Sequence, residues 1–241
     1  MTRPWLIAQN LNSSDPGVAA ALSAGDGSWL RGCARRIEEA GLDCIDCNAG
    51  TLGSAEAQVL GWMVEQIAPM VKIPLALDSP RPEVLVEVAR RSRRPVLLNS
   101  LALDTSWSPE LDELLVGTAN SAVLSLRRDG ELPTDAGTRR AWASAGVEAL
   151  TATGVEESQI FVDAIALPWG DDVEAGRGML EFVETWTSTR TLVGLGNIGY
   201  GNPEAVRIHR EWMGRLCDVG ISAAIMDAFE PGLREILPPR E

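Results

Sequence analysis

The sequence predicts a (β/α)8 barrel that forms one domain over residues 1–241. Short apolar runs alternate with amphipathic stretches along the chain, and this alternation is typical of a parallel sheet with crossover helices. Eight such repeats in 241 residues match a closed barrel in length. A doubly wound open sheet is the alternative, but it usually has fewer strands and a site at one switch point.

The predicted strands are short apolar runs, and the predicted helices carry apolar residues at spacings of three and four. The strands are residues 6–10, 44–50, 74–79, 95–100, 121–126, 160–164, 192–197 and 223–227. The helices are residues 27–41, 55–71, 81–92, 135–154, 171–188 and 203–220. Residues 229–241 are short for an eighth helix, so we expect the last unit to be trimmed or completed by a partner chain.

Most of the predicted strands end in a carboxylate or a carboxamide. These residues are Asn10, Asp46, Asn48, Asp78, Asn99, Asp163, Asn197 and Asp227. Polar groups at the ends of buried strands are costly unless something binds them, and barrels of this kind bind ligands at the carboxyl ends of their strands. Strand alternation places each polar residue on the face of an apolar one, as with Asp78 and Ala76 or Asn197 and Leu195. We therefore expect these side chains to converge on one pocket, although turn or N-cap roles are the alternative, especially for Asp78.

The residue types of this pocket favour a planar nitrogen heterocycle. Carboxylates accept paired N–H bonds from an amidine-like edge, and carboxamides both donate and accept, so a pterin or a purine fits. A sugar polyol would match the polar count but usually needs aromatic platforms. Magnesium prefers carboxylates, but here they alternate with Asn, so we predict no metal site.

Composition restricts the partners and the location. The net charge of −13 disfavours binding to nucleic acid or to an anionic membrane. No apolar run approaches the roughly 18 residues of a membrane helix, and the first residues fit a strand better than a signal peptide. We therefore expect a cytoplasmic protein. Cys44 and Cys47 form a C-x-x-C, but on a strand they point to opposite faces, which argues against a redox or metal pair.

Residues 194–199 read Gly-Leu-Gly-Asn-Ile-Gly and formally match a dinucleotide-binding fingerprint. The third glycine does not open a helix, because Pro203 marks the helix start, and the unit is the seventh of eight. We interpret the segment as a flexible loop that lets the backbone and Asn197 approach a ligand closely.

Taken together, these motifs resemble the pterin-binding barrel family, and within it the methyltetrahydrofolate:corrinoid methyltransferases. The matching segments are 45–50, 74–79, 98–100, Asp129-Gly130 with Pro133, Asp163 in 161–168, 194–198, and Asp227 in 223–228. They span nearly the whole chain in the family's order. The sister branch, dihydropteroate synthase, is less similar, since its Lys-bearing and Ser-x-Arg motifs are not found here.

The resemblance implies that a methyl group moves between N5 of tetrahydrofolate and the cobalt of a corrinoid. Asp78, Asn99 and Asp163 would hold the amide and amino edge of the pterin. Asn197 would lie beside N5, so Asn197 and Asp163 are the predicted catalytic residues. Asp46 and Asn48 would support the pterin from below. The predicted binding residues also include Asp227 and Asn10.

The resemblance also implies partners. Tetrahydrofolate or methyltetrahydrofolate is the expected substrate, and the corrinoid, a cobalamin, must be carried by a separate protein because the chain has no cobalamin-binding module. We expect a homodimer. Two alternatives stay open, namely a condensing enzyme like dihydropteroate synthase and a non-catalytic folate-binding subunit.

Three features depart from the family's pattern or need a role. The family commonly has Ser at the positions of Gly196 and Gly199, which predicts a looser seventh loop here. Arg127 and Arg128 follow the fifth strand and either meet the glutamate tail of folate or are ordinary loop charges. His209, the single histidine, is expected to be solvated or packed rather than catalytic.

Overall fold

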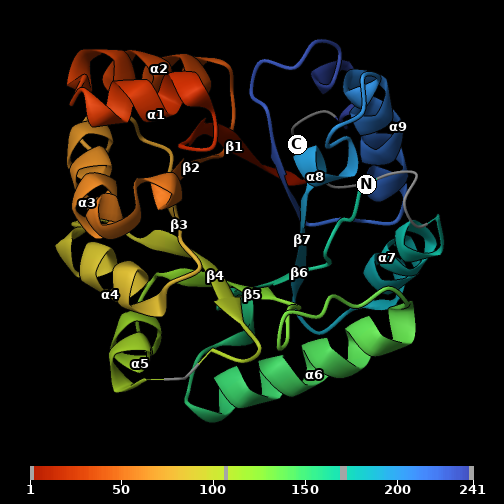
Figure 1. The fold of residues 1–241 in the computed structure, drawn as a ribbon. Coiled ribbons are helices and arrows are strands. Elements are labelled where there is room, and N and C mark those ends of the chain that lie inside the picture. Colours follow the sequence, from red (N-terminus) through yellow and green to blue (C-terminus); the bar gives the residue numbers. More distant parts are fainter. Residues whose placement is uncertain (1–2, 106–107, 169–172, 239–241) are drawn as a thin grey trace.

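The computed structural model describes residues 3–105, 108–168 and 173–238 (Figure 1). Its strands form a closed barrel in which each strand pairs with the next in parallel and β8 pairs with β1. The strands are β1 (Trp5–Asn12), β2 (Cys44–Asn48), β3 (Leu75–Asp78), β4 (Val96–Ala102), β5 (Ser121–Ser125), β6 (Ile160–Asp163), β7 (Arg190–Gly194) and β8 (Ala223–Met226). The predicted (β/α)8 barrel is confirmed.

Helices surround the barrel in the order that the alternation predicted (Figure 1). They are α1 (Pro16–Ser23), α2 (Gly27–Glu39), α3 (Glu56–Ile67), α4 (Pro82–Arg91), α5 (Pro109–Leu115), α6 (Ala136–Ala152), α7 (Val173–Thr185), α8 (Leu195–Ile198) and α9 (Ala205–Asp218). Short 3₁₀ segments are η1 (Gly50–Ala55), η2 (Glu157–Gln159) and η3 (Arg234–Ile236). Between β8 and residue 238, the described chain forms one short helical segment, η3.

Three helices were not predicted, because each is too short for a clear apolar period. Helix α1 has eight residues and α5 has seven, and both begin with a proline in the first turn. Proline is favoured there because its fixed φ suits the helix and its missing N–H has no intrahelical partner. Asp15 caps α1 by accepting hydrogen bonds from the N–H groups of Gly17 and Val18. The four-residue α8 lies inside a segment predicted as strand and loop.

The apolar residues form two separate cores. One layer fills the barrel interior and consists of Ile7, Cys44, Ala76, Leu97, Val123, Phe161, Leu192 and Ala223, each at most 2% exposed. The larger core lies between the strands and the helices. Cys44 belongs to the interior layer and Cys47 to the outer core, so the two thiols do point to opposite faces. Over the described ranges, no helix is both long and apolar enough to cross a lipid bilayer.

Candidate active site

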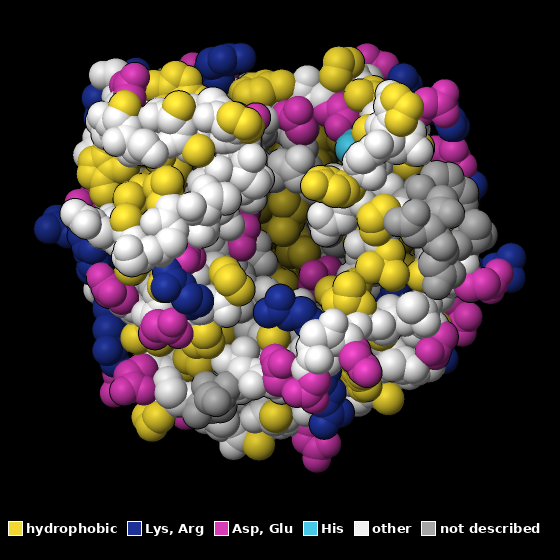
Figure 2. Space-filling model, viewed as in Figure 1, with side chains coloured by type: hydrophobic (Ala, Val, Ile, Leu, Met, Phe, Trp, Pro, Cys, Tyr) yellow, Lys and Arg dark blue, Asp and Glu magenta, His cyan; other side chains and the backbone are white. Residues whose placement is uncertain are grey.

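The interior layer continues upward into a ring of polar side chains at the carboxyl ends of the strands. The register pairs Asp78 on β3 with Asn99 on β4, and Ser125 on β5 with Asp163 on β6. Figure 2 shows this face hollowed at the barrel axis, with hydrophobic side chains on the floor and acidic side chains on the wall. The polar ring therefore sits above an apolar floor, which lowers the local dielectric constant around its charges.

Strands β2, β3 and β4 bring two carboxyl groups and one carboxamide together. Asn99 donates a hydrogen bond from Nδ2 to Oδ1 of Asp46 over 3.0 Å, and both residues are buried. Burial raises the pKa of Asp46 well above its usual range, and the neighbouring carboxylate of Asp78 raises it further. Burial also raises the pKa of Asp78, while hydrogen bonds from Asn48 and Asp46 oppose that rise. Of the two carboxyl groups, Asp46 therefore keeps its proton to the higher pH.

The raised pKa of Asp46 predicts how the stability of the fold depends on pH. A carboxyl whose folded pKa is raised stabilises the fold below its unfolded pKa of about 4, and this contribution is lost as the pH rises. A carboxamide at this position would mimic the protonated acid, so the Asp46→Asn variant should be roughly 1–3 kcal/mol more stable than the parent at pH 8 and gain less at pH 5. Urea unfolding at both pH values measures this. The exposed Asp218→Asn change is the control, and an equal gain for Asp46→Asn at both pH values would contradict the assignment.

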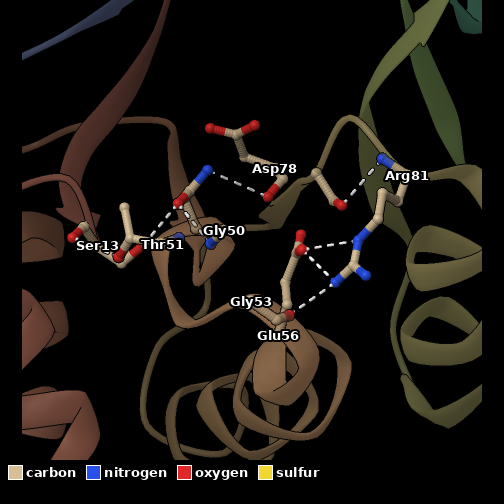
Figure 3. A network of polar contacts seen from close by, with 9 residues as sticks. Ser13, Gly50, Thr51, Gly53, Glu56, Asp78 and Arg81 are labelled. Carbon is tan, nitrogen blue, oxygen red and sulfur yellow. Dashed lines mark hydrogen bonds and ion pairs between the residues drawn. The ribbon is translucent and has the colours of Figure 1, made fainter.

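Asn48 organises the loop after β2 (Figure 3). Its Oδ1 accepts hydrogen bonds from Oγ of Ser13 and from the N–H of Gly50, each over 3.0 Å. Its Nδ2 donates to the backbone carbonyl of Asp78 over 3.4 Å. These contacts join the ends of β1, β2 and β3. The structure therefore places Asn48 at the predicted rim, where its side chain ties neighbouring strands together.

An ion pair between the half-exposed Arg81 and the buried Glu56 joins the loops after β2 and β3 (Figure 3). Nε of Arg81 donates to Oε2 of Glu56 over 2.9 Å, and Nη2 of Arg81 donates to the carbonyl of Gly53 over 3.1 Å. The Glu56 side chain is only 4% exposed, so its charge depends on this partner. Sequence reasoning missed this pair, although a glutamate at the first position of a helix is a recognisable signal.

Asp163 lies across the ring from the Asp46 cluster, at the end of β6. Its Oδ1 accepts a hydrogen bond from the N–H of Ile165 over 3.0 Å. Burial raises the pKa of Asp163 to about 6, against the lowering effects of that N–H and of the Arg139 guanidinium. Asp163 is thus a carboxylate at neutral pH that gains a proton under mildly acidic conditions.

Asn10 and Asp227 close the seam between β1 and β8. Nδ2 of Asn10 donates to Oδ1 of Asp227 over 2.5 Å, and Oδ1 of Asn10 accepts from the N–H of Ala228 over 2.8 Å. The parity of β1 points Gln9, not Asn10, to the face of Ile7, and an added Cβ at Gly196 would lie 2.9 Å from Oε1 of Gln9. Sequence reasoning missed Gln9, although its position two residues after Ile7 could have identified it.

The segment after β7 differs from its predicted form. The strand ends at Gly194, and Asn197 lies exposed on α8 rather than at a strand end. Leu195 accordingly packs in the outer core, so the predicted shared strand face of Leu195 and Asn197 is wrong. The side chain of Asn197 turns back toward the strand, since an added Cβ at Gly194 would meet its Nδ2 at 2.9 Å.

His209 fills the space beside Gly199. An added Cβ at Gly199 would lie 2.3 Å from Nε2 of His209 and 2.9 Å from Cβ of Ala205. His209 is buried, and its Nδ1 lies 2.7 Å from Oε2 of Glu230, so it is packed as expected. The expected looser loop is not found, because α8 forms there and His209 occupies the room that the missing side chain leaves.

The close contact at Gly199 predicts a specific loss of stability. The Gly199→Ala variant should lose about 1–3 kcal/mol of unfolding free energy, because His209 must shift to admit the methyl group. Gly214→Ala on α9 is the matched control, since nothing lies within 4 Å of an added Cβ there. Urea unfolding of both variants measures the difference, and equal stabilities would show that His209 moves without cost.

Arg127 and Arg128 are exposed after β5. Arg127 lines a groove of about 940 Å³ together with Pro80 of the loop after β3 and with Asp104 and Thr105 of the loop after β4. The groove also carries glutamates of α4 and α5, so its charge is mixed. Within the described residues, no group of three His, Cys, Asp or Glu side chains could hold a metal ion.

Comparisons with known proteins agree with this geometry. No family model matches the sequence. Among solved structures, the dihydropteroate synthase of Thermus thermophilus has a TM-score of 0.70 at 18% identity and covers 97% of this chain and 91% of its own. The dihydropteroate synthase of Xanthomonas albilineans in complex with 7,8-dihydropteroate has a TM-score of 0.70 at 16% identity, with the same coverage. The chain therefore has the fold of these dihydropteroate synthases.

A curated protein narrows the resemblance. The methylcorrinoid:tetrahydrofolate methyltransferase of Eubacterium limosum is 25% identical to this chain, over 92% of the chain and 84% of the relative. The predicted resemblance to the corrinoid methyltransferase branch of the pterin-binding barrels is confirmed, and so is the expectation of an enzyme.

Proposed function

We propose that this protein transfers a methyl group between N5 of tetrahydrofolate and the cobalt of a corrinoid carried by a separate protein. The observation that carries the proposal is the ring of buried and half-buried acids and amides above an apolar floor, which suits the edge of a pterin. The name of the Eubacterium limosum relative supports the same reaction. The homodimer and the cytoplasmic location stay predictions.

The pterin is recognised by three side chains with different hydrogen-bonding roles. The Asp163 carboxylate accepts N–H bonds from the amino-pyrimidine edge, as a carboxylate does from an amidine-like group. Asp78 supplies a second carboxylate on the opposite side of the ring. Asn99 is oriented by its hydrogen bond to Asp46, which leaves its Oδ1 to accept from the ligand. Asp46 acts beneath them as a proton-bearing support.

The chemical step needs no protein nucleophile. Cobalt in its reduced state supplies the electron pair that forms the cobalt–carbon bond, and N5 keeps the electrons of the broken carbon–nitrogen bond and takes up a proton. N5 is a poor leaving group without a proton or a strong hydrogen-bond donor, so the Nδ2 group of Asn197 beside it lowers the barrier. In the reverse direction the same contacts bind the free N5 amine as it accepts the methyl group.

The residue types at the rim are consistent with a reaction in which the protein supplies no nucleophile. The ring residues that the described strands present are acids, amides and one serine, so a transfer between two bound reactants matches them better than covalent catalysis. Cobalamin on a partner protein reaches N5 through the open face of the barrel. The exposed position of Asn197 on α8 lets it contact the reacting atom at that face.

The direct test mixes the protein with methyltetrahydrofolate and chemically reduced cobalamin and follows methylcobalamin formation by absorbance. Transfer above the protein-free rate supports the proposal. Tight folate binding without transfer, also with a cognate corrinoid protein, would instead favour a non-catalytic folate-binding subunit. Condensation of a pterin pyrophosphate with p-aminobenzoate would favour the synthase alternative, whose fold this chain shares.

A further inference from the structure

Arg139 is a fully buried arginine behind the loop that carries Asp163. It lies in the first turn of α6 and is 0% exposed. A buried guanidinium is costly unless hydrogen bonds compensate its lost hydration. Its Nε donates to the carbonyl of Ala164 over 2.9 Å, and its Nη2 donates to the carbonyl of Ile165 over 3.2 Å. Both carbonyls belong to the two residues that follow Asp163.

These hydrogen bonds hold an unfavourable backbone conformation. Ile165 has a φ of 53°, in the left-handed region that a β-branched side chain avoids. With this conformation, the N–H of Ile165 points back and donates to Oδ1 of Asp163 over 3.0 Å. Arg139 thus binds the carbonyl groups of Ala164 and Ile165, and the N–H of Ile165 orients the Asp163 carboxylate.

The guanidinium is also the charge that acts on Asp163 from α6. Arg127 and Arg128, which follow β5, are exposed, and Arg139 is the charged group that acts on the pKa of Asp163. Arg190 pairs with Phe161 at the opposite end of β7 and β6, and Arg140 lies 3.7 Å from Glu181 on the partly exposed outer side of α6 and α7. Strand β5 carries no charged residue. The positive charge behind the loop therefore comes from Arg139.

We propose that Arg139 is a positioning residue that fixes the 164–165 backbone and keeps the Asp163 carboxylate oriented and ionised for its ligand. The part of this inference that names the ligand rests on the proposed function, whereas the effect on Asp163 does not. Arg139 touches no substrate in this scheme and acts through the loop.

The first test measures Asp163 itself. Carboxyl ¹³C NMR of aspartate-labelled protein gives the titration midpoint, and the Asp163→Asn variant identifies the signal. We expect Arg139→Met to raise the midpoint by about one pH unit or more, because a charge and a hydrogen bond that favour the carboxylate are lost. Arg139→Lys keeps the charge but not the forked hydrogen bonds, so its midpoint should lie in between. Arg140→Met, at the next position on the same helix, should leave the midpoint unchanged.

The second test measures ligand binding against pH. Tetrahydrofolate binding to the Arg139 variants should weaken at neutral pH and recover as the pH rises, whereas Arg140→Met should match the parent. If Arg139→Met does not fold, Arg139→Lys decides. An unchanged Asp163 midpoint in every folded Arg139 variant would overturn the inference. Failure of the parent to bind tetrahydrofolate would refute the proposed function and leave the NMR result standing.

Discussion

The Asn197→Ala variant is expected to transfer methyl groups about 100-fold more slowly than the parent while its tetrahydrofolate affinity changes only a few-fold. The reason is that the proposed function puts the Nδ2 donor of Asn197 beside N5, where it is needed most in the transition state as the carbon–nitrogen bond breaks. An interaction made mainly in the transition state lowers kcat when it is lost. Single-turnover absorbance with reduced cobalamin gives the rate, and calorimetric titration gives the affinity.

The matched control for this variant lies in the same segment. Asn202 accepts a hydrogen bond from the N–H of Glu204 over 2.9 Å and has no role at the rim. Asn202→Ala should therefore keep the parent rate. A loss of affinity that equals the loss of rate in Asn197→Ala would mean that the side chain binds the ground state, and Asn197 would then be a binding residue only.

The Asp163→Asn variant is expected to bind tetrahydrofolate about 100-fold more weakly at pH 7.5, because a paired acceptor becomes a carboxamide with only one accepting atom. The pH dependence follows from the same group. With the pKa of Asp163 at about 6, the parent holds the carboxylate above this pH and should lose affinity as the pH falls below it. The variant should lose this dependence. Calorimetric titrations from pH 5 to pH 8 measure both effects.

Asp218→Asn is the control, since that exposed side chain lies at the end of α9, away from the rim. It should reproduce the parent curve. Should the Asp163→Asn variant retain the acid loss of affinity, the titrating group would be the Asp46–Asp78 pair, and the pterin would depend on Asp78 more than on Asp163.

Strand alternation alone placed much of the rim correctly. Asp46, Asp78, Asn99 and Asp163 each follow an interior apolar residue by two positions, and the structure has them at the ends of β2, β3, β4 and β6. Where a strand is regular, its alternation of two is sufficient to predict which side chains face the barrel interior. Sequence reasoning therefore recovered the barrel and these four positions at the strand ends without any knowledge of side-chain contacts.

The misplaced residues lie where the strands are irregular or end early. The register of β1 shifts between Ala8 and Leu11. Gln9 lies on the face of Ile7, whereas Asn10 bonds Asp227 at the seam between β1 and β8. Strand β7 stops at Gly194 because the chain turns into α8, which no sequence period marks. Arg139 was missed for a different reason, since an arginine next to Arg140 on an amphipathic helix is normally a surface residue.

The interior layer of the barrel determines the face from which ligands can enter. Eight apolar side chains, each at most 2% exposed, plug the cylinder below the rim. In the proposed reaction, folate and corrinoid would therefore both enter from the open face of the barrel, because this apolar layer closes the cylinder below the rim. On the proposed function, a carrier protein that covers this face would also block the exit of folate, so we expect the carrier to dissociate before folate leaves.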